Sequence, residues 1–162
     1  MRYKNYLFKK KEKESNTKYE LRKNLIENYI SAVDNNEEDL MNEVFAQDAS
    51  LEIKAHTTYV SFPEVTNNID EITNILVRDF SEKYENISTF CFIDTLVNEK
   101  DSITCNLLVC MRDKIDKKTL LSYGLYVWEF SEGSEIRVEK LNIEIENKLC
   151  EKLNLDKWVK SP

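Results

Sequence analysis

His56 is the residue of this chain best suited to proton transfer. It is the only histidine, and an imidazole has an ordinary pKa close to neutral pH. His56 directly follows residues 50–55, whose strict alternation predicts a strand, and it begins the polar run His-Thr-Thr-Tyr. We expect His56 to act as a general base beside a pocket; the alternative is an ordinary exposed loop residue.

Asp94 is the second candidate, because it is an acid within the otherwise apolar run FCFIDTLV. If Asp94 faces the interior, loss of water raises its pKa and allows it to act as an acid or a base. If it faces outward, it pairs with a neighbouring strand or with solvent. Strand parity does not decide between the two, because one bulge reverses the parity of every later residue.

The common signatures of cofactor and metal chemistry are absent from the sequence. It has no glycine-rich nucleotide motif, no G-x-S-x-G and no H-E-x-x-H. The spacings of Cys91, Cys105, Cys110 and Cys150 match no metal-ligand pair, and their apolar surroundings indicate reduced thiols. We therefore expect no cofactor and no metal site.

Length and composition predict a single globular domain. The chain has 162 residues, of which 41% are hydrophobic and 33% charged. No apolar run reaches the roughly 18 residues of a spanning helix, so no transmembrane segment is expected. The sequence also lacks a signal-peptide pattern, which favours a cytoplasmic location.

The charges are distributed unevenly along the chain. Residues 1–18 contain seven Lys or Arg and two Glu, which leaves 16 basic and 28 acidic residues in the rest. Such an acidic body would repel phosphate backbones, so we expect no nucleic-acid partner. Residues 1–17 are predicted to form a basic N-terminal arm, which is either a solvated tail or a contact to an anionic membrane surface.

Residues 119–146 are predicted to form a long β-hairpin around which the sheet is built. Two apolar-rich segments of period two are joined by a polar turn at residues 131–134. Both faces are apolar, since Trp128 points to one side and Leu125 to the other. One face therefore needs helices, and the other needs a partner or a terminal segment. The alternation of apolar and polar residues shifts by one position near residues 139–140, which predicts a β-bulge.

Helices and shorter strands precede this hairpin. Thr17 and Glu20 form a capping box for the first helix, and Asn68 caps the third. Residues 56–65 are predicted to be a loop, with a short edge strand at residues 57–61 as the alternative. The predicted helices cover residues 18–33, the segment after residues 34–36 and the segment after Asn68, and the predicted strands before the hairpin are residues 50–55, 87–97 and 103–111.

This order of elements predicts an α+β fold in which a bent, mostly antiparallel mixed sheet wraps around three N-terminal helices. Residues 25–53, LIENYISAVDNNEEDLMNEVFAQDASLEI, and residues 126–130, YVWEF, carry a resemblance to a known family. The chain resembles the nuclear transport factor 2-like superfamily, and within it SnoaL-like and ketosteroid isomerase-like proteins. The resemblance implies a cone domain over residues 18–147, followed by a tail over residues 148–162.

The resemblance also implies where a site should lie. In ketosteroid isomerases a helix tyrosine donates a hydrogen bond to the substrate, and Tyr29 matches that position. The position of the base falls on Ile53, which cannot take a proton, and the second acid falls at about Tyr126. The isomerase mechanism is therefore not expected here, although Tyr29 and Tyr126 together could polarise a carbonyl or bind a phenol. The cone interior is expected to be lined by Ile53, Phe92, Tyr126 and Trp128.

Two functions follow from these expectations. The first is a SnoaL-like protein that binds a small apolar or aromatic molecule and carries out cofactor-free acid-base chemistry of the isomerase, cyclase or dehydratase type. His56 would then transfer the proton, Tyr29 would orient the ligand, and Asp94 would be a further acid. The alternative is a non-catalytic ligand-binding or protein-interaction module of the same fold. In both cases the family resemblance implies a homodimer formed through the outer face of the sheet.

Overall fold

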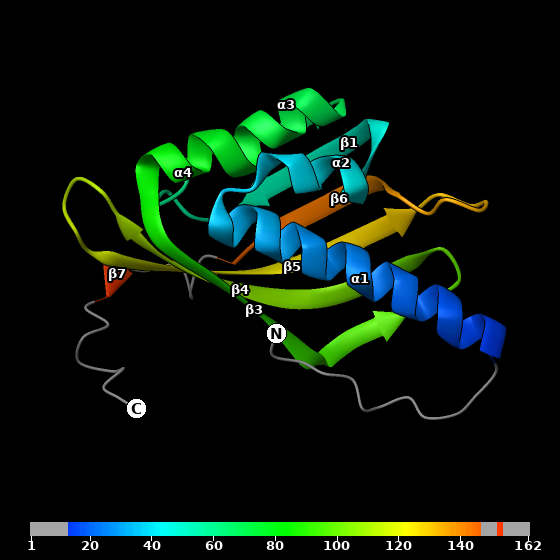
Figure 1. Ribbon diagram of the computed structural model, residues 1–162. Helices are drawn as coiled ribbons and strands as arrows, with labels where there is room; N and C mark the ends of the chain where they lie inside the picture. The colour runs from blue at the N-terminus through cyan, green and yellow to red at the C-terminus, as the bar shows by residue number, and fades with distance from the viewer. Residues whose placement is uncertain (1–12, 147–151, 154–162) are drawn as a thin grey trace.

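The computed structural model of the chain describes residues 13–146 and 152–153, and the side chains of residues 17–146. Most of the predicted basic arm and of the predicted tail, including Cys150, therefore lies outside the described residues. Figure 1 shows the described helices on one side of a single twisted sheet. None of the described helices combines the length and apolar character needed to cross a membrane.

The helical part begins with one long helix and continues in short segments. Asn36 follows α1 with a φ of 56°, and this left-handed conformation, which asparagine tolerates, ends the helix. The Asn68 side chain accepts a hydrogen bond of 3.0 Å from the Glu71 amide and so caps α3, as the sequence predicts. The segments are α1 (Lys13–Asn35), η1 (Glu38–Leu40), α2 (Met41–Val44), α3 (Ile69–Thr73), the π-helical turn η2 (Asn74–Arg78) and α4 (Asp79–Lys83).

The sheet runs in the order β2-β1-β6-β5-β4-β3, and a short β7 pairs with β5. The pairing of β1 with β6 is parallel and the others are antiparallel, so the sheet is mixed and mostly antiparallel, as predicted. The strands are β1 (Phe45–Ala55), β2 (Val65–Asn67), β3 (Tyr84–Asn98), β4 (Ser102–Asp113), β5 (Thr119–Phe130), β6 (Val138–Ile145) and β7 (Lys152–Leu153).

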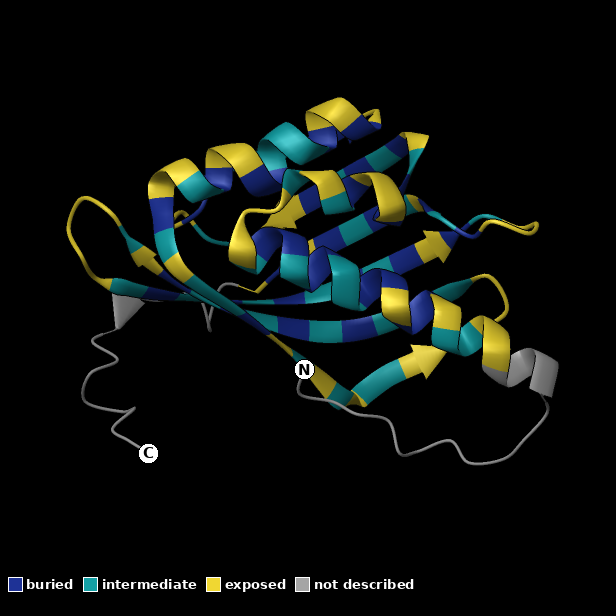
Figure 2. Cartoon of the chain, in the orientation of Figure 1, coloured by how far each residue is buried: buried dark blue, intermediate teal, exposed yellow. Residues whose placement is uncertain are grey.

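Burial alternates along the central strands, as Figure 2 shows. In β4 and β5 a buried residue is followed by a half-buried one almost throughout. The buried set faces the helices and forms the core, in which Trp128, Phe45, Ile26 and Met41 are at most 1% exposed. The other face of these strands carries apolar side chains that are only half-buried.

Three details of the strands bear on the sequence predictions. Glu129 pairs with Lys140 and the adjacent Phe130 with Val138, so Glu139 is an extra residue and forms the predicted bulge. The first strand begins at Phe45, five residues earlier than predicted, because it follows α2 directly. The alternative edge strand at residues 57–61 is wrong; the edge strand is β2, where Glu52 pairs with Val65.

Candidate functional site

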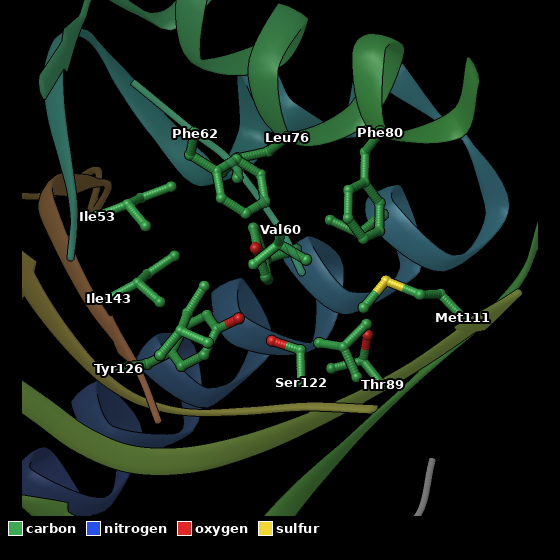
Figure 3. A pocket seen from close by; sticks show the side chains of 14 residues that line it. Ile53, Val60, Phe62, Leu76, Phe80, Thr89, Met111, Ser122, Tyr126 and Ile143 are labelled. Atoms are coloured by element: carbon green, nitrogen blue, oxygen red, sulfur yellow. The ribbon is translucent and has the colours of Figure 1, made fainter. Parts of the chain in front are cut away.

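The helices and the sheet enclose a small apolar cavity, shown in Figure 3. Its volume is about 40 Å³, which is room for about two or three water molecules. Side chains from α1, β1, the β1–β2 loop, η2, α4 and β3 to β6 line it. The cavity is narrow because Val60 and Phe62 of the β1–β2 loop point into it. Val60 is only 5% exposed.

Two tyrosine hydroxyls are the polar groups at the most buried end of the cavity, which we call the deep end. Tyr29 comes from α1 and Tyr126 from β5, and their hydroxyls interact, since each influences the pKa of the other. The ring centroids are 6.5 Å apart and the rings are tilted by 62°. Burial raises the pKa of Tyr29 well above its ordinary value and also raises the pKa of Tyr126. Both hydroxyls are therefore protonated at neutral pH and able to donate a hydrogen bond.

Trp128 lies behind the two tyrosines rather than in the cavity lining. Its ring is stacked on Tyr126 with centroids 5.9 Å apart and meets Tyr29 edge-on at 5.1 Å. Because Trp128 is completely buried, these contacts hold both tyrosine rings in place. Trp128 thus packs against the two tyrosine rings from outside the cavity, whereas Ile53 and Tyr126 line it.

Thr89 and Ser122 add two hydroxyls to the lining. The Thr89 amide and hydroxyl donate hydrogen bonds of 2.9 and 2.7 Å to the carboxylate of Asp34, close to the end of α1. This bidentate contact joins the helix to β3 beside the cavity. The carboxylate of Asp34 fixes the scaffold, and Asp34 is not among the residues that line the cavity.

His56 lies away from the cavity, on the outer face of the sheet. It continues the parity of Glu52 and Lys54 rather than that of the inward Ile53, and it is exposed. Its Nε2 lies 2.7 Å from a carboxylate oxygen of Glu144, another outward residue on the neighbouring strand β6. The structure therefore does not bring His56 together with Tyr29, as a general base acting in the cavity would require.

Asp94 and Phe92 also lie outside the cavity. Thr89 faces inward on β3, and residues of the opposite parity, including Phe92 and Asp94, are exposed. The Phe92 ring packs beside Tyr123 of β5 on the outer face, with centroids 5.6 Å apart. The bulge that could have turned Asp94 inward lies within residues 92–97 and leaves it exposed.

Several lining residues were not singled out from the sequence. Thr89 and Ser122 sit at inward positions of β3 and β5, and alternation could have identified them once the faces were assigned. Val60 and Phe62 are apolar residues in an otherwise polar loop, which is a signal that the loop folds inward. Within residues 17–146, no three His, Cys, Asp or Glu side chains come together as a metal site.

Comparison with protein-family models and with curated proteins finds no match to this chain. Solved structures do match. The hexachlorocyclohexane dehydrochlorinase LinA-type3 from Novosphingobium barchaimii LL02 is 12% identical, with a TM-score of 0.69 over 86% of this chain and 92% of that one. A structure of LinA matches with a TM-score of 0.71 at 12% identity, over 91% and 96% of the two chains.

A third match is named for the superfamily itself. The nuclear transport factor 2-like superfamily protein from Salmonella enterica serovar Typhimurium LT2 is 12% identical, with a TM-score of 0.60 over 83% of this chain and 94% of that one. At such identities the likeness concerns the fold, and it agrees with the helix order and the mixed sheet described above. The chain has the α+β cone fold of nuclear transport factor 2-like proteins.

Proposed function

We propose that this chain binds a small apolar molecule carrying a hydrogen-bonding oxygen in the cavity between α1 and the sheet, and that it does so without acid-base catalysis. The observation that carries the proposal is the buried Tyr29–Tyr126 hydroxyl pair at one end of a lining that is otherwise apolar except for Thr89 and Ser122. Such a lining with a few convergent polar groups is typical of ligand sites.

The absence of a base among the lining residues favours binding over catalysis. Apart from the tyrosines, none of the described residues that line the cavity is ionisable. The LinA proteins are named for a dehydrochlorination, a reaction in which a proton and a chloride are removed. Tyr29 has a raised pKa, so it remains protonated and cannot accept that proton at neutral pH. A ligand oxygen that accepts a hydrogen bond from either tyrosine suits this site better.

Methyl NMR tests the proposal directly. We expect phenol, added to protein with labelled isoleucine and methionine methyl groups, to shift the signals of Ile53, Ile143 and Met111, which line the cavity. The methyl groups of Ile115, which is 92% exposed, are the internal control. Tyr29→Phe should weaken binding by about three- to tenfold, the value of one neutral hydrogen bond. Shifts confined to Ile115, or none at millimolar phenol, would refute the proposal.

We further propose that the chain forms a homodimer through the outer face of β3, β4 and β5. Phe90 and Phe92 are 37% and 39% exposed on this face, and Leu121, Tyr123 and Leu125 beside them are half-buried. A contiguous apolar surface of this kind is typical of a subunit interface. A self-complementary patch around a two-fold axis would cover it on both copies.

Light scattering coupled to gel filtration tests the dimer. Leu125→Asp should give a monomer with an unchanged far-ultraviolet circular dichroism spectrum, because the side chain is only half-buried in the single chain. The exposed Glu129→Ala, on the same strand, is the matched control and should remain dimeric. A wild-type protein that is monomeric at about 100 μM, a concentration at which standard interfaces are saturated, would contradict this proposal.

A further inference from the structure

A second hollow lies next to the cavity, on the other side of the β1–β2 loop. It has a volume of about 210 Å³ and runs between residues 60–63 of that loop and the helical segments η2 and α4. Its apolar part includes Ile75 and Phe80, and its exposed part carries Asp79 and Lys83. We call this hollow the outer groove.

Three side chains form the wall between the cavity and the outer groove. Val60, Phe62 and Phe80 line both spaces. The rings of Phe62 and Phe80 are stacked, with centroids 6.3 Å apart and planes inclined by 24°. In Figure 3 Val60, Phe62 and Phe80 lie together at the edge of the cavity formed by the loop and the helix. Displacement of these shared side chains would therefore bring the two spaces together.

The loop that carries this wall is held by side-chain packing. Its ends are fixed, because the Ile53 amide donates to the Glu64 carbonyl at 2.9 Å and the His56 amide donates to the Ile145 carbonyl at 3.0 Å. Between these two points, residues 57–63 make no backbone–backbone hydrogen bond within the described chain. The loop is therefore held between its ends mainly by side-chain packing, and a ligand that replaces this packing can displace it.

The helical segments η2 and α4 contribute side chains to both the cavity and the outer groove. Ile75, Asp79 and Lys83 follow one another at intervals of four residues and face the outer groove. Leu76 and Phe80, each one position further along, face the cavity. The π-helical turn at Asn74–Arg78 lies where the two rows begin, and such turns are frequent at functional sites.

We propose that the cavity and the outer groove form one site for an elongated neutral ligand, with an apolar body that displaces Val60 and Phe62 and an oxygen at each end. This rests on the proposed function, which places one oxygen at Tyr29 and Tyr126. The other oxygen lies between Asp79 and Lys83, which offer an acceptor and a donor. Their opposite charges favour a neutral end of the ligand, because a single charge there would be attracted by one residue and repelled by the other.

Linear diols of increasing length test this inference. Titrations of the full chain followed by methyl NMR would compare 1,4-butanediol, 1,6-hexanediol and 1,8-octanediol with 1-octanol. We expect Kd to fall by about fourfold for each methylene added beyond butanediol. Octanediol should bind about three- to tenfold more tightly than 1-octanol, because only the diol places an oxygen in the outer groove. Octanediol, but not butanediol, should shift the methyl signals of Ile75, which lines the outer groove and not the cavity.

Substitutions in the outer groove separate this inference from the proposed function. Asp79→Ala and Lys83→Ala, both at exposed positions, should remove the advantage of octanediol over 1-octanol and leave phenol binding unchanged. Glu82→Ala, an exposed residue of α4 outside the groove lining, is the control and should change neither. An affinity that stops rising at butanediol, or a diol advantage that survives both substitutions, overturns the inference while phenol binding persists. If phenol and the diols all fail to bind, the proposed function falls as well.

Discussion

The interaction between the Tyr29 and Tyr126 hydroxyls should appear as a coupling free energy in a double-mutant cycle. Both side chains are buried, with exposed fractions of 4% and 7%, and their hydroxyls lie close enough to influence each other's pKa. Tyr29→Phe leaves the Tyr126 hydroxyl without this partner, and the converse holds for Tyr126→Phe. Each single substitution should lower the free energy of unfolding by about 1 to 3 kcal/mol, the cost of an unsatisfied buried polar group.

The double variant should cost less than the sum of the two single variants. With both hydroxyls removed, no polar group of the pair remains buried and unsatisfied, so we expect a coupling free energy of about 1 kcal/mol. For a chain of this size, 1 kcal/mol corresponds to a change in Tm of about 2 to 4 °C. Urea unfolding followed by circular dichroism measures all four proteins of the cycle, and equal m-values would show that the unfolding reaction is the same.

A matched control comes from the opposite face of the same strand. Tyr123 is half-buried on the outer side of β5, so Tyr123→Phe should change the free energy of unfolding by no more than about 0.5 kcal/mol. Additivity of the Tyr29 and Tyr126 substitutions within about 0.3 kcal/mol would show that the hydroxyls do not interact, and would refute the account of the deep end of the cavity.

Three further predictions concern the packing and charges around the site. Gly124→Ala should destabilise the chain by about 1 to 3 kcal/mol in urea unfolding, because its new Cβ would lie 3.1 Å from the Glu144 carbonyl oxygen; a neutral effect would show that the sheet moves apart there. His56→Ala removes a half-exposed contact to Glu144, so it should cost at most about 1 kcal/mol and leave phenol binding unchanged, and a loss of binding measured by NMR would contradict the outward placement. Burial raises the folded-state pKa values of Tyr29 and Tyr126 above the ordinary 10.0, so at high pH the folded chain keeps protons that the unfolded chain loses. The contribution of the two tyrosines to stability is therefore complete below about pH 10 and is lost as the pH rises toward the folded-state values. Between about pH 9.5 and 11, the range in which an unfolded tyrosine titrates, the urea midpoint of the double Phe variant should fall less than that of the wild type.

Much of the fold followed from local patterns that the tertiary structure left intact, but the predicted capping box at Thr17 is wrong, because α1 begins at Lys13. Alternation marked the central strands, Asn68 marked the start of a helix, and the change of phase at residues 139–140 marked a bulge. The parallel pairing of β1 with β6 brings together segments about ninety residues apart, for example Leu51 and Leu141. Such a contact depends on the whole topology and leaves no mark in either segment alone.

The candidate site was only partly predictable, and the reasons differ between residues. Tyr29, Ile53 and Tyr126 line the cavity because they lie on apolar faces whose direction periodicity determines. For His56, the alternation of residues 50–55 indicates the outer face, which it shares with Glu52 and Lys54. The direction of the Asp94 side chain depends on the position of a bulge in β3. The inward position of Phe62 depends on how an irregular loop packs.

The most direct test of the central claim is a crystal structure of the chain grown with phenol. We expect a phenol ring between Ile53 and Ile143, with its oxygen within hydrogen-bonding distance of the hydroxyl of Tyr29 or Tyr126 and with Val60 displaced from its present position. Phenol bound only on the outer face of the sheet, with the cavity lining unchanged, would contradict it.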